Sequence, residues 1–231
     1  MAQPTRARSS VRILIVEDHT LFAESLDLAL TMERYDVRRL PVPEMGSSQR
    51  ALLSAVIRLH PQIVLLDLDL GHMGDGVRLI APLARSGTHV VVVTASADKG
   101  RWGECIWYGA RKVLTKGRPL NEILATVRRI SQGLPVMDAA EREDLLAAWH
   151  EERKEHEVLR ERLERLTHRE REVLGQLMEG HTVRDIAQAS VVSVATVRTQ
   201  VKSILAKLEV SSQLAAVGLA HAVDWHAPSG D

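Results

Sequence analysis

Four short apolar runs in the first half of the chain each lead directly into a polar or charged residue. The runs and the residues that follow them are 13–16 with Glu17 and Asp18, 63–66 with Asp67, 90–93 with Thr94, and 113–115 with Lys116. Short apolar runs separated by helix-like segments are typical of buried parallel strands. Ligands bind at the carboxyl ends of such strands. The pattern therefore predicts that three carboxylates, a hydroxyl and an ammonium group converge on one sheet edge, as a metal-and-phosphoryl site requires.

The first part of the chain alternates between strand-like and amphipathic segments. The predicted strands are 11–16, 36–40, 63–67, 89–94 and 111–115, and the predicted helices lie near 19–31, 48–59, 75–85, 97–108 and 120–132. Five strands alternating with five helices predict a doubly wound α/β domain, which we place at residues 11–135. Gly133 and Pro135 mark its end. The fourth helix is the weakest of the set, because Gly100 and Gly103 both disfavour helical structure.

Residues 138–166 contain no Gly or Pro and are rich in Glu, Arg, Leu and Ala. One set of positions falls at alternating steps of four and three residues and is apolar except for two polar interruptions: Leu145, Trp149, Glu152, His156, Leu159, Leu163 and Leu166. This spacing predicts a long helical linker with an apolar seam. Fewer than four uninterrupted heptads do not establish a coiled coil. The segment is therefore either a solvated connecting helix or a dimer-forming coiled coil.

Residues 167–225 predict four compact helices and hence an all-α domain. The helices are expected at 169–178, 184–189, 194–208 and 213–223. Thr167 is placed to cap the first of them, with Glu170 three residues later completing a capping box. Thr182 and Ser193 are placed to cap the next two.

Length and composition narrow the class of protein. At 231 residues the chain is long enough for two domains, and its 45% hydrophobic residues support real cores. The formal net charge of zero conceals an uneven distribution, with +5 over residues 1–137, −4 over 138–166 and −1 over 167–231. The net charge therefore neither favours nor excludes a nucleic-acid partner, and the local distribution of cations has to decide.

Three features bear on where the protein works. The single cysteine, Cys105, excludes an internal disulfide and is consistent with a reducing cytoplasm. Residues 1–10 lack the apolar stretch of a signal peptide. No segment approaches the roughly 20 apolar residues of a membrane-spanning helix. The sequence thus predicts a soluble cytoplasmic protein without a membrane partner.

The residue types at the strand ends suit phosphoryl transfer to a carboxylate. Mg²⁺ prefers hard oxygen ligands, which Glu17, Asp18 and Asp67 supply. A carboxylate can also attack phosphorus to form an aspartyl phosphate. The oxygens of the transferred group then need neutralising partners, for which Lys116 offers an ammonium and Thr94 a hydroxyl group.

Five short motifs within residues 11–132 follow one another in a fixed order. They are Val16-Glu17-Asp18, Leu65-Leu66-Asp67, Val93-Thr94-Ala95, Gly109-Ala110 and Leu114-Thr115-Lys116. In this order and approximate spacing they resemble the receiver domain of bacterial two-component response regulators. The resemblance implies a flavodoxin-like fold in which Asp67 takes a phosphoryl group from the phosphohistidine of a sensor kinase. It also implies that Glu17, Asp18, Asp67 and the backbone carbonyl of Asp69 hold Mg²⁺.

Two stretches depart from the receiver pattern. Gly71 stands where the family usually has a Pro, and the Asp75-Gly76 pair arrives one residue late, so the loop after Asp67 is longer and richer in Gly. We expect this loop to alter partner docking or the lifetime of the phosphoryl group. Val113 occupies the position of the family's switch aromatic, which puts the usual coupling of the threonine to that aromatic in doubt.

Two further side chains near this region are unassigned by the resemblance. Trp107 stands where relatives commonly carry a polar residue. An exposed Trp would mark an interface, whereas a buried one would indicate a shifted helix, and the sequence leaves both open. His19 adjoins the acidic pair, but a surface histidine beside carboxylates requires no special role.

The predicted helix 194–208 carries cations on one face. Arg198 and Lys202 are four residues apart and share that face with Thr199. The opposite, apolar face consists of Val194, Val197, Val201, Ile204, Leu205 and Leu208. A short helix, a turn and a second helix with outward cations describe helix-turn-helix geometry.

Motifs in the last third of the chain sharpen this prediction. They are LTHREREVL at 166–174, Glu179-Gly180, Ile186-Ala187 and TVRTQVK at 196–202. Together they look like the LuxR-type helix-turn-helix of the NarL/FixJ class. The resemblance implies that Arg198, Thr199 and Lys202 meet the major groove, and that Thr182, Ser193 and Lys207 meet phosphates. Arg184 is our candidate for an additional backbone contact. The domain's net charge of −1 favours binding as a homodimer to two half-sites of double-stranded DNA.

The leading hypothesis is a DNA-binding response regulator, phosphorylated on Asp67, that controls transcription and is not an enzyme. One alternative is an orphan regulator whose receiver acts as a phosphorylation-independent dimerisation or binding module, which the altered loop and Val113 favour. The other is a haloacid-dehalogenase-like phosphatase, because Asp67-Leu68-Asp69 imitates its nucleophile motif. That family places further acids after its Lys, whereas here the acidic pair comes first. The kinase, the signal, the operator and the direction of control are not specified by the sequence.

Overall fold

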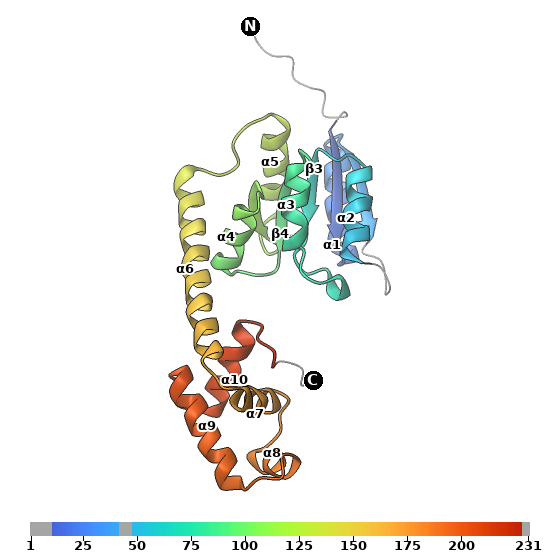
Figure 1. Cartoon of the computed structure of the whole chain (residues 1–231). Helices are drawn as coiled ribbons and strands as arrows, with labels where there is room; N and C mark the ends of the chain where they lie inside the picture. Colours follow the sequence, from blue (N-terminus) through green and yellow to red (C-terminus); the bar gives the residue numbers. More distant parts are fainter. Residues whose placement is uncertain (1–10, 42–47, 228–231) are drawn as a thin grey trace. The chain divides into compact units, whose positions relative to one another are not determined.

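The computed structural model describes residues 11–41 and 48–227. The chain consists of two compact units, Met1–His150 and Glu151–Asp231 (Figure 1). The prediction that residues 1–10 are no signal peptide falls outside the described residues.

The first unit contains a five-stranded sheet in the order β2-β1-β3-β4-β5. Its strands are β1 (Arg12–Glu17), β2 (Asp36–Pro41), β3 (Ile63–Leu66), β4 (His89–Thr94) and β5 (Lys112–Thr115). All four pairings are parallel, and Leu14 at the centre of β1 lies opposite Arg38 on one side and Val64 on the other. Each predicted strand is present within one residue of its expected bounds. The predicted five-stranded parallel sheet is confirmed.

Helices cover both faces of this sheet (Figure 1). They are α1 (Thr20–Met32), α2 (Gln49–Arg58), α3 (Val77–Arg85), α4 (Lys99–Trp107) and α5 (Leu120–Ser131). Because successive side chains of a strand point to opposite faces, Ile13 and Ile15 pack with α1 and α5, whereas Leu14 and Val16 pack with α2, α3 and α4. The doubly wound arrangement is thus confirmed, and it explains why the central strands read as unbroken apolar runs.

A sixth helix, α6 (Ala139–Glu164), begins in the first unit and packs there against α4. Leu145 and Trp149 of α6 are 7% and 8% exposed. The ring centroid of Trp149 lies 4.8 Å from that of Trp107, which is itself 52% exposed. Trp107 is therefore the exposed tryptophan of the two alternatives, although its ring also contacts Trp149 of α6. Cys105, on the same helix α4, is fully buried.

Gly103 explains how α6 approaches α4 so closely. A Cβ atom on Gly103 would lie 2.0 Å from the backbone oxygen of Leu145 and 2.7 Å from Cβ of Trp149. The glycine that weakens this helix in isolation is therefore the residue that lets the second helix dock. The predicted helix near 97–108 is present, at Lys99–Trp107.

The second unit is all-helical. It holds the end of α6 together with α7 (His168–Met178), α8 (Val183–Ala189), α9 (Val194–Leu208) and α10 (Gln213–Ala222). Leu163 and Leu166 of the predicted apolar seam are buried in its core, and Leu159 packs against that core. Both ends of the seam of α6 are therefore buried by contacts within the same chain. Pairing of this helix with a second copy of the chain stays a prediction. The four-helix all-α domain is confirmed.

Side-chain caps begin these helices where the sequence places them. The hydroxyl group of Thr167 accepts from the N–H of Glu170, whose carboxylate accepts from the N–H of Thr167 in return. Thr182 forms the same box with Asp185 at the start of α8. Ser193 accepts from the N–H of Thr196 at the start of α9. These caps satisfy N–H groups that have no partner inside the helix, and they set the entry of the chain into each helix.

Among the described residues, no single helix is long and apolar enough to cross a membrane. Within the part of the chain that the structure describes, α9 and α10 taken together are the one pair that meets the requirements of length and composition, with a bend of 53° between them. Both helices contribute to the core of the second unit.

Val191 lies in the turn between α8 and α9 with a φ of 54°. Left-handed backbone is costly for a β-branched residue, and this side chain is 91% exposed, so it gains almost no packing in return. We expect Val191→Gly to stabilise the second unit by about 1 kcal/mol, because Gly adopts this conformation without steric cost. Amide hydrogen exchange in α8 and α9 measures the change. A variant that exchanges as fast as the parent, or faster, would contradict the expectation.

Candidate functional site

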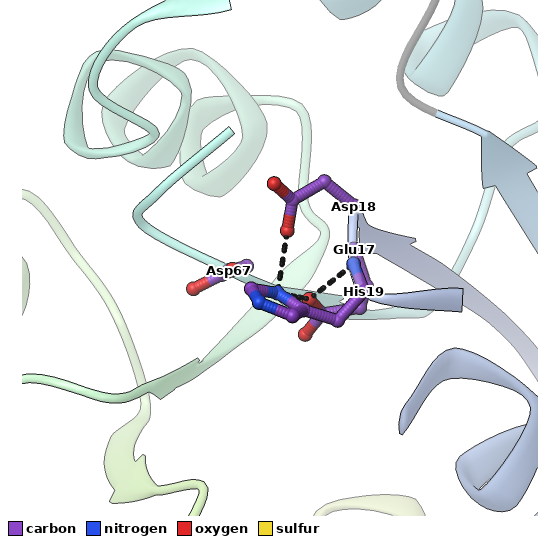
Figure 2. A group of neighbouring side chains, drawn as sticks. All are labelled: Glu17, Asp18, His19 and Asp67. Carbon is purple, nitrogen blue, oxygen red and sulfur yellow. Dashed lines mark hydrogen bonds and ion pairs between the residues drawn. The ribbon is translucent and has the colours of Figure 1, made fainter. Parts of the chain in front are cut away.

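The acidic residues predicted at the strand ends meet at one edge of the sheet. Glu17 is the last residue of β1, Asp18 follows it, and Asp67 comes directly after β3. These three, together with His19, each offer a ligand atom, and the four atoms lie within 4.8 Å of one another (Figure 2). Glu17 and Asp67 are 7% and 2% exposed, which is unusual for carboxylates that carry no function.

Lys116 holds two of these carboxylates together. Its Nζ lies 2.7 Å from Oε1 of Glu17 and 2.8 Å from Oδ2 of Asp67. Burial acts to lower the pKa of Lys116, but the hydrogen bonds to Asp67 and Glu17 outweigh it and raise the pKa above its usual value. Burial raises the pKa of Glu17 in spite of its hydrogen bonds with Lys116 and the N–H of His19. The ammonium therefore stays charged at the position where the sequence predicts it.

Thr94 and a cavity beside it complete the edge. Thr94, the last residue of β4, is 3% exposed, and its Oγ1 accepts a hydrogen bond from the N–H of Ser96 at 3.2 Å. A hydroxyl group that accepts one hydrogen bond can still donate its own hydrogen to another partner. A cavity of about 410 Å³ is lined by Thr94, Asp67 and Lys116. Asp69 also lines it, and its N–H lies 3.3 Å from Oδ1 of Asp67. The structure thus brings the predicted acceptor, hydroxyl and ammonium groups to one cavity.

His19 contacts the acidic residues of this site directly. Its Nδ1 is 2.8 Å from Oδ1 of Asp18 and 3.1 Å from Oε1 of Glu17 (Figure 2). The charge of Lys116 acts to lower the pKa of His19, but the two carboxylates outweigh it and raise the pKa. The ring is 67% exposed, so the histidine rests on the outer side of the acidic group.

The donor set fits a hard divalent cation. Glu17, Asp18 and Asp67 supply three carboxylates at one point, and Mg²⁺ binds through a few carboxylate oxygens and waters. Asp69 lies at the rim of the same cavity. Three carboxylates with one ammonium among them leave an excess of negative charge, which a divalent cation would balance.

The loop after Asp67 follows a path that the family's usual residues could not take. Gly71 has a φ of 58°, which Pro cannot adopt. Asp69 and Asp75 form an isolated antiparallel bridge across the base of the loop. Gly76 then packs directly on the acceptor strand, because a Cβ on it would lie 2.4 Å from the backbone oxygen of Asp67. The Asp75-Gly76 pair therefore lies beside the acceptor, although it comes one residue later in the sequence than is usual. A 3₁₀ turn at Gly71–Met73 accommodates the additional residue of the loop.

Arg101 is a residue of this cavity that the sequence did not single out. It lies in the first turn of α4, lines the cavity, and pairs through Nη2 with Oδ1 of Asp75 at 3.0 Å. No spacing motif links these two positions, which are 26 residues apart. The only signal in the sequence is a cation three residues after Asp98, the residue that caps α4.

The DNA-facing residues predicted on α9 are exposed. Arg198, Thr199 and Lys202 all lie on its solvent side, whereas Val197 and Val201 are buried. Thr199 bonds through its hydroxyl to the backbone oxygen of Ala195 at 3.0 Å. The helix thus presents two cations and a hydroxyl group, as a helix that enters a groove requires.

The residues predicted to meet phosphates differ in their freedom. Arg184 is exposed on α8. Thr182 and Ser193 are exposed, but their hydroxyl groups bond to Asp185 at 2.6 Å and to Thr196 at 2.8 Å. Lys207 completes the set, and its Nζ lies 2.6 Å from a carboxylate oxygen of Glu170. Lys207 therefore has an intramolecular partner that a phosphate would have to replace.

Comparison with known families identifies both units. The family described as response regulator receiver domain matches residues 13–128. The family described as bacterial regulatory proteins, luxR family, matches residues 164–220.

Individual proteins resemble the chain over nearly its whole length. The transcriptional regulatory protein LiaR of Bacillus subtilis (strain 168) is 28% identical over 216 residues, which cover 91% of this chain and 97% of LiaR. The response regulator protein VraR of Staphylococcus aureus (strain NCTC 8325 / PS 47) is 27% identical over 210 residues, 90% of this chain and 95% of VraR. A solved structure of RcsB from Salmonella enterica serovar Typhimurium, bound to promoter P1flhDC in the presence of phosphomimetic BeF3-, has a TM-score of 0.50 at 20% identity, and covers 90% of this chain and 97% of that one. At this identity the structural likeness shows the fold alone.

Proposed function

This chain belongs to the response-regulator family, as a receiver domain followed by a LuxR-type DNA-binding domain, and we propose that phosphorylation of Asp67 by a sensor histidine kinase controls its binding to DNA. The observation that carries the proposal is the position of Asp67, buried at the carboxyl end of β3 with an ammonium at 2.8 Å and two further acids beside it. A buried carboxylate held this way is poised to act as a nucleophile.

The proposed step moves one phosphoryl group. A carboxylate oxygen of Asp67 attacks the phosphorus of the kinase's phosphohistidine, an O–P bond forms, and the P–N bond breaks with its electron pair going to the imidazole. Lys116 neutralises one oxygen of the transferred group, and Thr94 donates its hydroxyl hydrogen to another. Mg²⁺ held by Glu17, Asp18, Asp67 and the carbonyl of Asp69 would supply further positive charge to the same oxygens.

The output of this step is proposed to be DNA binding by the second unit. Arg198, Thr199 and Lys202 would contact bases in the major groove. The proposed phosphate contacts are Arg184, Thr182, Ser193 and Lys207. The structure of RcsB with a promoter supports DNA as the partner of this architecture. We further propose that the chain acts in the cytoplasm and binds DNA as a homodimer, because the net charge of −1 over residues 167–231 gives one copy little nonspecific affinity.

Incubation with Mg²⁺ and phosphoramidate tests the first step. Mass spectrometry of the intact chain should show the addition of one phosphoryl group, and Asp67→Asn should abolish it. Asp144→Asn removes an exposed carboxylate on α6 and serves as the control. This variant should still take up the phosphoryl group. Fluorescence anisotropy with DNA recovered by genomic footprinting then compares the two forms. Equal affinity and oligomeric state with and without the phosphoryl group would favour the orphan regulator.

Two cations of the second unit should differ in their effect on DNA binding. We expect Arg198→Ala to weaken the specific site by about 1–3 kcal/mol and to relax preference at one base position, because Arg pairs with a guanine edge through two bonds. Arg184→Ala should weaken all sequences equally and reduce the slope of log affinity against log salt by about 1. Titrations at several salt concentrations, with specific and scrambled duplexes, separate the two. A uniform loss from Arg198→Ala would exclude its contact with bases.

A further inference from the structure

The phosphoacceptor cavity has a second cation besides Lys116. Arg101 lines it from the first turn of α4 and pairs with Asp75, which lines the same cavity. The pair is part-exposed, with the side chains of Arg101 and Asp75 37% and 42% accessible. Both partners line the cavity and both side chains reach solvent, so the pair does not belong to the buried core.

The two partners of this ion pair are not equally free to move. Asp75 is fixed, since its Oδ1 also accepts the N–H of Val77 at 3.0 Å and its backbone oxygen accepts from Gln49 at 2.7 Å. Gly76, the next residue, packs on the backbone of Asp67. The guanidinium group of Arg101, in contrast, is connected to α4 only through a long, flexible side chain. A change in the cavity would thus be followed by the guanidinium and not by the carboxylate.

The guanidinium also has unused hydrogen-bonding capacity. Only its Nη2 bonds to Asp75 in the described part of the chain, and Nε is buried there without a hydrogen-bond partner. A buried N–H without an acceptor is unfavourable. Asp75 does not relieve it here, because in the described residues its carboxylate bonds to the guanidinium through Nη2 and not through Nε. The resting ion pair therefore leaves Arg101 poorly satisfied.

We propose that Arg101 is a phosphoryl-binding residue that moves from Asp75 to the phosphoryl group when Asp67 is modified. Modification replaces a carboxylate with a group of higher negative charge and three strong acceptor oxygens. Arg binds such a group through two parallel N–H bonds, which are stronger than its single bond to Asp75. Asp75 acts as the resting partner that holds the guanidinium at the rim. The inference rests on the proposed phosphorylation of Asp67 and adds a ligand to it.

Binding of beryllofluoride to the full chain with Mg²⁺ tests the proposal, because this probe occupies the phosphoryl position without a covalent reaction. Fluorine NMR titration gives the dissociation constant for each variant. Arg101→Gln should weaken binding about tenfold, and Arg101→Lys should restore part of it because Lys bonds as a point charge. Asp75→Asn should tighten binding several-fold, because it frees the guanidinium while its side-chain oxygen can still accept the N–H of Val77. Arg78→Ala removes an exposed cation of α3 and should change nothing.

The direction of the two substitutions separates this role from a mere tether. If the ion pair only fastens the loop to α4, Arg101→Gln and Asp75→Asn break the same contact and should weaken binding alike, and that result would overturn the proposal. Unchanged binding in Arg101→Gln would overturn it too. Absence of binding in the parent chain would instead contradict the proposed phosphorylation site, and Asp67→Asn supplies the reference for no binding.

Discussion

Replacing Gly103 with Ala is expected to detach the first part of α6 from α4. In an isolated helix this substitution is favourable by about 1 kcal/mol. Here the new Cβ would lie 2.0 Å from the backbone oxygen of Leu145 and 2.7 Å from Cβ of Trp149, and a backbone atom cannot move aside alone. Leu145 and Trp149 would lose their burial, which is worth about 1.5–3 kcal/mol for each large side chain. We therefore expect the docked state of α6 to lose about 3–5 kcal/mol.

Gly218→Ala provides a matched control for this prediction. Gly218 lies inside α10 and has nothing within 4 Å of the Cβ position, so the same substitution should stabilise the second unit by about 0.5–1 kcal/mol. Amide hydrogen exchange over residues 139–150, together with the emission maximum of the Trp residues, measures the release of α6. A gain in stability from Gly103→Ala, like that from Gly218→Ala, would show that α4 and α6 are not in close contact.

Replacing Glu170 with Gln is expected to destabilise the second unit by about 3 kcal/mol at neutral pH. Glu170 is 6% exposed and accepts from Lys207 at 2.6 Å, from Ser203 at 2.6 Å and from the N–H of Thr167 at 2.7 Å. Burial acts to raise the pKa of Glu170, but these bonds outweigh it and lower the pKa from 4.5 to about 2. A shift of this size corresponds to about 3 kcal/mol in favour of the folded state. The substitution also leaves the ammonium of Lys207 without its charged partner.

The same lowered pKa fixes the pH dependence. The folded state binds the Glu170 proton more weakly than the unfolded state, so the stabilisation is complete above about pH 4.5 and is lost as the pH falls towards 2. Glu170→Gln should remove this part of the acid sensitivity. Urea unfolding followed by hydrogen exchange in α7 and α9 measures both effects. Glu172→Gln is the control on the same helix, because its ion pair with Arg169 is more exposed and should contribute less than about 1 kcal/mol. Equal losses in the two variants would contradict the special role of Glu170.

The sequence predicts most of the first unit because its signals are local. Strands such as 13–16 and 63–66 are buried on both faces and therefore appear as unbroken apolar runs. The polar residue after each run lies at the binding edge by topology alone, so the order of the residues is enough to place Glu17, Asp67 and Lys116 together. The helix starts at Thr167 and Ser193 were equally predictable, because a cap acts over three residues.

Contacts between segments that are distant in the sequence produce no comparable local pattern. Gly103 counted against a helix in the sequence, because its reason is a second helix about 42 residues further along the chain, and helix propensity takes no account of tertiary packing. The apolar seam of residues 145–166 left a connecting helix and a coiled coil both open, and its pattern did not indicate that its two ends are buried in the two units of its own chain. Arg101 with Asp75, and Lys207 with Glu170, were missed for the same reason, since an ion pair has no periodicity.

The single cysteine, buried on α4, provides a natural probe for local opening of this helix. Burial raises the pKa of Cys105 to about 12, so almost no thiolate forms near neutral pH, and the side chain is fully enclosed. A thiol reagent can therefore label the folded chain only when α4 opens. The rate at which the unmodified protein is labelled therefore measures the opening of α4. No probe has to be introduced, and the chain has no second cysteine that would react as well.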